Sequence, residues 1–379
     1  MKLIDLLEEA RNSTANLALQ YDAYNLLYSK NIKDFLNDNN KDECVKFMLS
    51  AMESYVKNDI SKDIIIPNKE RANHCVITWL LGIGINNRLN ILKKRRLSDA
   101  LWTQTAAIHD YGYFSEYTKH NDTILSKIGT KYDLLTDKYN DDLLLCLNDM
   151  SVKKNELFSY NYFEIKQYFE YSKFLHREII GEDYSHEMCD HGIIGACLIF
   201  DKYCRQIYKE KKNIIPITPD NDITKVQKIA AITIASHNIF KNSKKDNPTW
   251  KKQNKKLKML GLDKLMTNSK YKIAKDNELL SLLSLVDTIE CYKKFRRDET
   301  RSMVNTNTIL DTIDISFSNK KEIIFDMSEF VKKTNRNENK DEIIEKTTSH
   351  IKSICNMKDW TSFKTKQISD YCVKIRWIS

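Results

Sequence analysis

Six side chains that can bind a metal ion lie in strongly apolar segments or at the ends of predicted helices. They are four histidines and two aspartates: His74, His109, Asp110, His191, His237 and Asp287. Asp287 stands out because the leucine-rich segment LLSLLSLVDTIECY surrounds it, and a buried ionised carboxylate needs a cation. Taken alone, Asp287 is better explained by a buried salt bridge or a helix cap, and each histidine is better explained as a core histidine than as a ligand. Together, imidazole and carboxylate form the ligand set that transition metals favour, and we predict a metal site.

The order and local context of these residues resemble the HD superfamily of metal-dependent phosphohydrolases. AAIHDYG is similar to the superfamily's helix ending, in which small apolar residues precede His-Asp and a glycine follows. HGIIGA, which starts at His191, is similar to its His-x-x-x-Gly-Ala segment, and LVDTIE is similar to its last ligand helix. The resemblance covers residues 65–298 and is interrupted by an insertion at 113–182.

The resemblance implies a cofactor of two divalent metal ions that share Asp110. The first ion is then held by His74, His109, Asp110 and Asp287, and the second by Asp110, His191 and His237. Two such ions acidify a bridging water and neutralise a phosphoryl oxygen. The expected activity is hydrolysis of a phosphoester or phosphoanhydride of a nucleotide or oligonucleotide, as in phosphodiesterases and nucleotidases. The ligands do not distinguish among Mn, Mg, Ni, Co, Fe and Zn.

One position departs from the superfamily pattern and leaves the substrate phosphate without its usual cation. Many members have lysine three residues after the His-Asp aspartate, where this chain has Tyr113. A cation that follows Asp287 by about two turns is the replacement we expect, from the set Lys293, Lys294 and Arg297. Two spare histidines, His186 and His120, are candidates for protonating a leaving oxygen, with a surface position as the alternative for each.

Two other function classes are consistent with the same ligands. Relatives of myo-inositol oxygenase hold a di-iron pair with a similar order of ligands, and iron with O₂ consumption would identify that class. A metal-stabilised sensor that binds nucleic acid or a partner protein is the non-catalytic alternative. Its candidate contacts are the basic segments 93–96 and 251–258, although lysine clusters are also typical of a solvated face.

Composition favours a helical protein and excludes several classes. The chain has 379 residues with 8 glycines and 4 prolines, which argues against many tight turns. The net charge of +9 is compatible with phosphate-bearing partners, and no apolar run approaches the roughly 20 residues of a membrane span. An acidic start and nine cysteines without a C-x-x-C pair predict a cytoplasmic protein with reduced thiols and no signal peptide.

Hydrophobic periodicity predicts the elements that position these residues. Helical patterns cover about 1–30, 42–58, 69–85, 99–110, 141–148, 163–179, 185–208, 223–238, 276–296 and 340–357. Strand patterns cover 311–318, 322–327 and 368–377.

We therefore predict a mainly α fold with a small α+β unit at its C-terminal side. A helical HD domain at 65–298 follows an N-terminal helical extension at 1–64 and precedes the α+β region at 299–379. The insertion at 113–182 directly follows the His-Asp pair, so we expect it to cover the site and select the substrate. The α+β region is a candidate oligomer interface.

Overall fold

The computed structural model describes this chain in separate stretches. They are residues 1–14, 25, 27–36, 41–54, 69–92, 99–112, 191–193, 195–197, 222–237, 277–295, 303–318, 321–359 and 361–378. The chain forms two compact units. Unit 1 comprises Met1–Ala107 and Ser281–Ser379, and unit 2 comprises Ile108–Leu280. Unit 1 is thus assembled from two stretches that lie far apart in the sequence.

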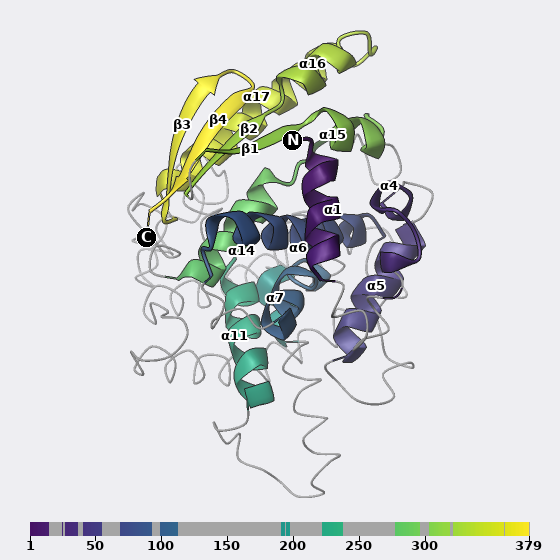
Figure 1. Ribbon diagram of the computed structural model, residues 1–379, viewed down its shortest axis with the longest axis vertical. Coiled ribbons are helices and arrows are strands. Elements are labelled where there is room, and N and C mark those ends of the chain that lie inside the picture. The colour runs from purple at the N-terminus through teal and green to yellow at the C-terminus, as the bar shows by residue number, and fades with distance from the viewer. Residues whose placement is uncertain are drawn as a thin grey trace, which may run out of the picture. The chain divides into compact units, whose positions relative to one another are not determined.

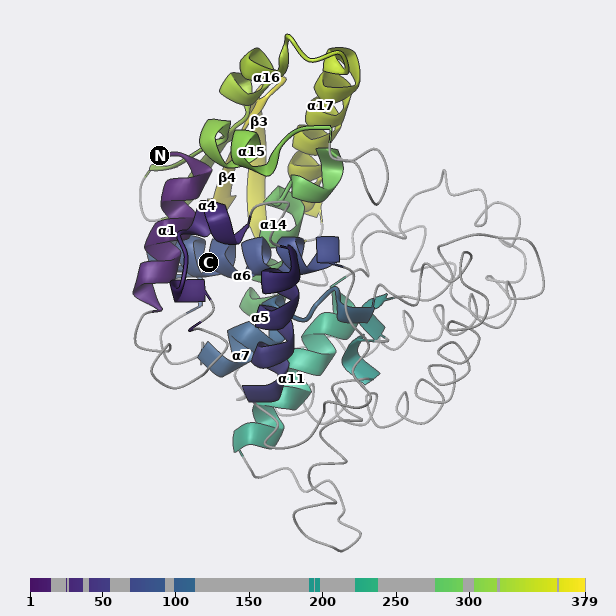
Figure 2. The ribbon, with the colours of Figure 1, turned by 90° about the vertical axis from the view of Figure 1, so that its right-hand side faces the viewer.

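A long buried helix, α6 (Lys69–Leu89), is the centre of the helical part of unit 1 (Figure 1). Its described side chains are buried on nearly every face from Ala72 to Asn86, which explains the nearly continuous apolar pattern of this segment. The helices around it contact it on several sides (Figure 2). They are α1 (Leu3–Ser13), α5 (Lys41–Ser54) and α7 (Asp99–Ala106), while the short α4 (Ile32–Phe35) contacts α1 and α5.

The close approach of α6 and α7 depends on Gly82. A Cβ atom at this position would lie 1.8 Å from Cζ2 of Trp102, so the indole ring occupies the space that any side chain would need. The indole N–H of Trp102 donates to the carbonyl oxygen of Trp79 at 3.0 Å, and that of Trp79 donates to Oγ1 of Thr103 at 3.1 Å. Two buried tryptophans thus fix α7 on α6 with their polar atoms satisfied.

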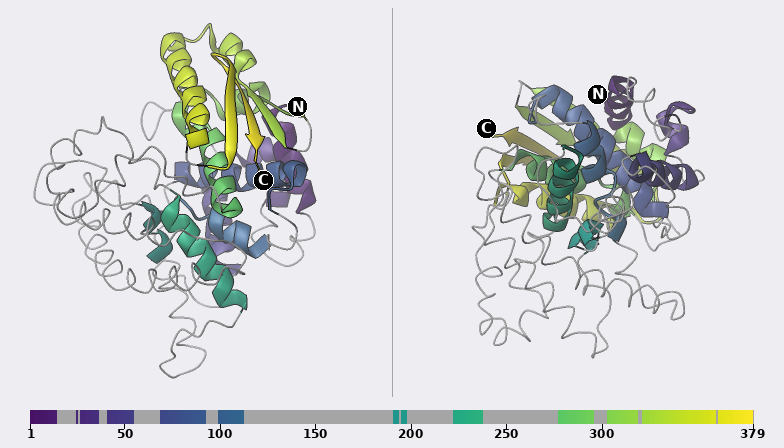
Figure 3. Two further views of the ribbon diagram at one scale, coloured as in Figure 1. Left: turned by 90° about the vertical axis from the view of Figure 1, so that its left-hand side faces the viewer. Right: turned by 90° about the horizontal axis from the view of Figure 1, so that it is seen from below.

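The C-terminal part of unit 1 contains a four-stranded antiparallel sheet with strand order β1-β2-β4-β3 (Figure 3). The strands are β1 (Asp314–Ser318), β2 (Glu322–Asp326), β3 (Phe363–Ser369) and β4 (Cys372–Trp377). Alternating residues of the central strands are buried, with Ile323 opposite Ile375 and Phe325 opposite Val373. One face of the sheet therefore carries the core of this part.

Three helices accompany the sheet, and the longest covers its buried face. They are α15 (Thr306–Thr312), α16 (Ser328–Thr334) and α17 (Lys340–Asn356), which is followed by the 3₁₀ turn η5 (Met357–Asp359). α17 packs on β3 and β4 and buries one helical stripe that includes Ile343, His350 and Ile354.

The α+β region is joined to the N-terminal helix by backbone hydrogen bonds. The N–H group of Leu3 donates to the carbonyl oxygen of Ile313 at 2.8 Å, and Lys2 forms an antiparallel bridge with Asp314. The Lys2 ammonium also contacts the Asp314 carboxylate at 2.7 Å. Within unit 1, the start of the chain is therefore part of the same structure as β1.

The helix that carries Asp287 is α14 (Glu278–Ile289), which belongs to unit 1 from Ser281 onwards. Its own leucine and valine side chains are buried on all sides of the helix, as the sequence predicts. The helix ends at Ile289, and the chain then forms a single 3₁₀ turn, η4 (Tyr292–Phe295), whose Tyr292 and Phe295 side chains are buried. This break decides where the residues after Asp287 lie.

The described part of unit 2 is small. It contains α11 (Asp222–Ser236), helical residues at 191–193 and 195–197, and a turn at 108–112 that follows α7. The expected helices at 185–208 and 223–238 are confirmed where the structure describes them.

The mainly helical fold and the small antiparallel sheet agree with the sequence prediction, but several boundaries were wrong. The helix predicted for 99–110 ends at Ala106, so His109 and Asp110 lie in the turn that follows it. The helix predicted for 276–296 gives way to η4. The strand predicted for 311–318 starts at Asp314, because residues 306–312 form α15 with the Asn305 side chain accepting from the Asn307 N–H group.

The last strand was also predicted incorrectly. Residues 363–377 form a hairpin of two strands rather than one strand at 368–377. β3 is an edge strand with lysines and other polar residues exposed, so it lacks the apolar alternation that marks β2 and β4. The turn at Asp370 and Tyr371 contains no glycine, asparagine or proline to signal it.

Other predicted features lie outside the described residues. They are the insertion at 113–182 with its helices at 141–148 and 163–179, and the basic segments 93–96 and 251–258. Among the helices that the structure does describe, none combines the length and the hydropathy that a membrane span requires.

Candidate metal centre

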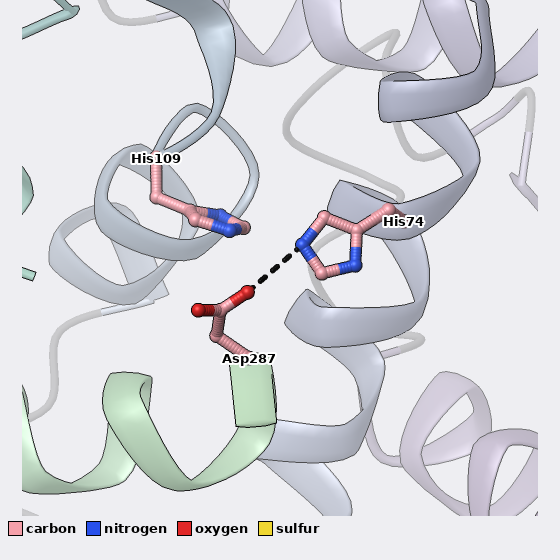
Figure 4. Close-up of side chains that lie close together, drawn as sticks. All are labelled: His74, His109 and Asp287. Carbon is pink, nitrogen blue, oxygen red and sulfur yellow. Dashed lines mark ion pairs between the residues drawn. The ribbon is translucent and has the colours of Figure 1, made fainter. Parts of the chain in front are cut away.

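Unit 1 brings together His74 of α6 and Asp287 of α14, the first and the last of the predicted ligands. Nε2 of His74 lies 3.1 Å from Oδ1 of Asp287, and both side chains are buried (Figure 4). We call this group, with Glu290 and Lys293, the first half-site. His109, also drawn in Figure 4, belongs to unit 2 and is described with that unit below.

Glu290 is a partner of His74 that the sequence analysis did not identify. Its Oε2 atom lies 2.5 Å from Nδ1 of His74, and its Oε1 atom accepts a hydrogen bond from the backbone N–H of Tyr292 at 2.6 Å. A carboxylate on one imidazole nitrogen directs the lone pair of the other nitrogen towards a metal ion, and metal-binding histidines almost always have such a partner. The available signal was its position three residues after Asp287, one helical turn further on.

The first half-site attracts positive charge. Burial lowers the pKa of His74 and the Lys293 ammonium lowers it too, but Glu290 and Asp287 outweigh both, so the pKa of His74 is raised above its ordinary value of 6.5. Two carboxylates and one ammonium group face the His74 ring, and the carboxylates determine the direction of the shift.

Lys293, one of the predicted phosphate-binding residues, lies within the first half-site. Its Nζ atom is 2.9 Å from Oδ1 of Asp287 and 3.1 Å from Nε2 of His74. Lys294 follows it on η4 and is half-buried, and Arg297 lies outside the described residues. The role of these three residues towards a substrate phosphate stays a prediction.

Unit 2 brings together the other four predicted ligands, with three histidines around one carboxylate oxygen of the aspartate. Oδ1 of Asp110 lies 3.1 Å from Nε2 of His191, 3.4 Å from Nε2 of His109 and 3.7 Å from Nε2 of His237. All four side chains are at most 4% exposed. We call them the second half-site.

The imidazole rings of the second half-site turn the same nitrogen inwards. Nε2 of His191 and Nε2 of His237 lie 3.1 Å apart, and the rings of His109 and His237 meet edge to face with centroids 5.3 Å apart. Nδ1 of His237 lies 2.6 Å from the carbonyl oxygen of Ile234, which can only accept, so Nδ1 carries the proton. In the neutral ring, Nε2 of His237 therefore has the lone pair, and it lies 3.1 Å from Nε2 of His191 and 3.7 Å from Oδ1 of Asp110.

Close backbone packing sets this geometry. A Cβ atom on Gly112 would lie 2.1 Å from the carbonyl oxygen of His191 and 2.9 Å from the backbone nitrogen of Gly195. A Cβ atom on Gly195 would be in ordinary contact with Ile234 of α11 at 3.5 Å. The His109-Asp110 turn, the segment that starts at His191 and the end of α11 thus pack backbone against backbone.

The donor set of the second half-site fits a divalent metal ion. The candidate ligand atoms of His109, Asp110 and His237 lie within 4.8 Å of one another in a buried place, and histidine with carboxylate is the ligand chemistry of Zn, Mn, Fe, Co and Ni sites. Buried lone pairs that face one another repel unless a proton or a metal ion lies between them. Such a group could therefore hold a metal ion.

The two histidines predicted as proton donors cannot be compared with this geometry. His186 and His120 lie outside the described residues, so their roles stay predictions.

Comparisons with known proteins identified no relative of this chain. No protein-family model matches the sequence, and no curated protein or solved structure matches it either.

Proposed function

We propose that this protein is a metal-dependent phosphohydrolase of the HD type. The proposed reaction is hydrolysis of a phosphoester or phosphoanhydride in a nucleotide or oligonucleotide. The observation that supports it most strongly is the second half-site, where three histidine Nε2 atoms surround one Asp110 oxygen at 3.1–3.7 Å. The order of ligands, shared with the HD superfamily, links this geometry to phosphate chemistry.

His109, Asp110, His191 and His237 are the residues that would hold the metal ion. When bound, a divalent ion of this kind acidifies a water molecule and offsets negative charge on a phosphoryl oxygen. The four side chains are already buried and oriented, so they need little reorganisation to bind it. The carbonyl oxygen of Ile234 holds His237 in the tautomer that presents Nε2.

Burial contributes to the proposed chemistry as well. Asp110 is 2% exposed, and electrostatic interactions of its carboxylate are stronger there than in water. The carboxylate would therefore keep a cation close and limit competition from solvent. Its place among three imidazoles makes Asp110 the residue whose loss should affect metal binding most.

The test is the Asp110→Asn variant, which keeps the size of the side chain and removes its charge. Its matched control is Asp341→Asn on the exposed face at the start of α17. Both variants and the unchanged protein are assayed against nucleoside triphosphates, cyclic nucleotides and short oligonucleotides with Mn, Mg, Ni, Co, Fe or Zn. We expect phosphate-ester hydrolysis to fall more than about 100-fold in Asp110→Asn and to persist in Asp341→Asn.

Three results would contradict the proposal in different ways. Full hydrolysis by Asp110→Asn would exclude the second half-site as the centre of the reaction. O₂ consumption with bound iron would identify the oxygenase class instead. Metal binding without turnover of any of these substrates would favour a structural metal in a sensor or binding protein.

A further inference from the structure

The ammonium group of Lys293 contacts the two atoms of the first half-site that a metal ion would use. Nζ lies 2.9 Å from Oδ1 of Asp287 and 3.1 Å from Nε2 of His74, and those two atoms lie 3.1 Å from each other. The three atoms form an almost equilateral triangle.

Lys293 and a metal ion compete for the same lone pair. The Glu290 carboxylate can only accept, so Nδ1 of His74 carries a proton, and in the neutral ring Nε2 has the single lone pair, which points in one direction in the ring plane. An ammonium group can only donate, so its contact with Nε2 uses that lone pair. An imidazole nitrogen that accepts a hydrogen bond from Lys293 cannot bind a metal ion at the same time.

Charge strengthens this competition. Asp287 is 6% exposed, and an unpaired carboxylate there would be strongly destabilising. The Lys293 ammonium neutralises it without any added ion. A divalent ion at the same atoms would lie next to a positive charge in a buried place, so the two cations repel each other.

The 3₁₀ turn after α14 explains why Lys293 reaches this position. On a continuous helix, residues six apart do not share a face, so Lys293 would point away from Asp287. The helix instead ends at Ile289, and η4 is anchored by the buried side chains of Tyr292 and Phe295. The hydrogen bond from the Tyr292 N–H group to Glu290 fixes the start of this turn.

We propose that the first half-site is an ammonium site, in which Lys293 takes the place of one of the two metal ions that the HD resemblance implies. The protein then binds a single metal ion, at the second half-site, and Lys293 supplies the other positive charge permanently. This inference rests on the proposed metal binding at the second half-site, and it changes the expected stoichiometry of the centre.

The experiment counts metal ions in three versions of the full chain. The protein is stripped with a chelator, dialysed against Mn²⁺, and analysed for manganese per chain by mass spectrometry. Lys293→Met keeps the aliphatic stem and removes the ammonium group, and Lys352→Met on the exposed face of α17 is the matched control. We expect one ion in the unchanged protein and in Lys352→Met, and two ions in Lys293→Met.

Further variants keep the test decisive if Lys293→Met does not fold. Lys293→Arg retains a cation and should still bind one ion. Asp287→Asn removes a ligand of the first half-site, so the inference requires that its ion count equal that of the unchanged protein. Circular dichroism and thermal unfolding verify that each variant is folded before the ions are counted.

The outcomes separate this inference from the proposed function. Two ions in the unchanged protein, falling to one in Asp287→Asn, would overturn the ammonium site while leaving the hydrolase proposal intact. One ion in both the unchanged protein and Lys293→Met would also overturn it, because Lys293 would then exclude nothing. If no variant binds an ion, both the ammonium site and the metal-dependent hydrolase proposal are overturned. If the unchanged protein binds no ion and Lys293→Met binds one, the result supports the ammonium site but not metal binding at the second half-site.

Discussion

Gly112 is the residue that fixes the second half-site through its lack of a side chain. A Cβ atom there would meet the carbonyl oxygen of His191 at 2.1 Å, and a backbone atom cannot rotate out of the way. We expect Gly112→Ala to displace His191 from Asp110 and to weaken metal binding roughly 10–100-fold, the range seen when a supporting contact of a metal ligand is lost. Isothermal titration with Mn²⁺ measures this affinity.

Gly195 provides the control for that prediction. A Cβ atom on Gly195 would make contacts of 3.5–3.9 Å, which are ordinary packing distances, so Gly195→Ala should retain the affinity. Equal affinities for the two variants would show that the close contact at Gly112 does not hold His191 in place.

His350 lies outside both half-sites and predicts a dependence of stability on pH. Its ring is fully buried on α17, Nε2 donates to the carbonyl oxygen of Ile289, and the ring meets Phe325 edge to face. Burial, together with the smaller effect of the nearby Lys294 and Lys293 ammonium groups, lowers the pKa of His350 from 6.5 to about 3. Between these two values only the unfolded chain binds the proton, so the folded state loses stability as the pH falls from 6.5 towards 3.

The variant His350→Gln keeps a hydrogen-bond donor near Ile289 and cannot titrate. From pH 7 to pH 5 we expect its free energy of unfolding to fall less than that of the unchanged protein, by about 2 kcal/mol. Urea unfolding at both pH values measures this difference. All other titratable groups are the same in both proteins and their contributions cancel, so equal losses would contradict a buried neutral His350.

At the scale of single residues, the sequence predicted the ligands better than their partners. His74 and Asp287 are detectable because a polar side chain in an apolar helix is unfavourable unless it has a binding partner. Glu290 lies one helical turn after Asp287, but the sequence does not show that its carboxylate reaches Nδ1 of His74. The contact between Lys293 and Asp287 depends on where α14 ends, which periodicity does not determine.

At the scale of elements, the β3–β4 hairpin contains a repulsion between like charges, which a single substitution can convert into an attraction. Lys366 lies directly opposite Lys374, and Lys364 lies opposite Arg376. Like charges in opposite positions are destabilising, and opposite charges contribute roughly 0.2–1 kcal/mol. We expect Lys366→Glu to raise the thermal midpoint and Lys366→Gln to give an intermediate value.

Salt provides a second measurement of the same effect. The differences between these variants should shrink at 1 M NaCl, because the Lys366 side chain is exposed and salt screens its interaction with Lys374, which also contacts Glu322 at 2.9 Å. A midpoint for Lys366→Glu below that of the unchanged protein would show that the lysine has another role, such as protecting the edge strand from pairing with other chains.

Helix and strand types were predictable from the sequence, but their ends were less so. α6 and α14 are long, nearly continuous apolar segments and α17 has one apolar helical stripe, so these helices were found. The end of α7 at Ala106 and the end of α14 at Ile289 lack a glycine or proline signal, and both ends decide how site residues lie. β3 was missed because an exposed edge strand has little hydrophobic pattern.

At the scale of the whole molecule, metal binding should stabilise the fold. A ligand that binds only the folded state at 100 times its dissociation constant contributes about 2.7 kcal/mol. We expect Mn²⁺ to raise the thermal midpoint of the stripped protein, and we expect the Asp110→Asn variant to show no such rise. Differential scanning calorimetry with and without Mn²⁺ makes this comparison, and an equal rise in both proteins would place the binding elsewhere.

The assembly of unit 1 could not be predicted from the sequence. The residues 299–379 were expected as a separate α+β region, and the boundaries at 64/65 and 298/299 stay a prediction. In the structure, the N–H group of Leu3 pairs with Ile313, and α17 donates from His350 to the end of α14. Such pairing between distant segments depends on which backbone atoms lie opposite each other, and hydrophobic periodicity does not predict this.

The distance along the chain between His74 and Glu290 has a consequence for biosynthesis. The two residues are separated by 216 positions, and ribosomes add roughly 5–20 residues per second, so His74 waits on the order of 10–40 s for its carboxylate partner. During that time α6 lacks the α14 and η4 contacts that complete its surroundings. A nascent chain of this protein therefore lacks part of the packing around a helix that is buried in the folded state, and we expect it to be a client of chaperones that bind at the ribosome.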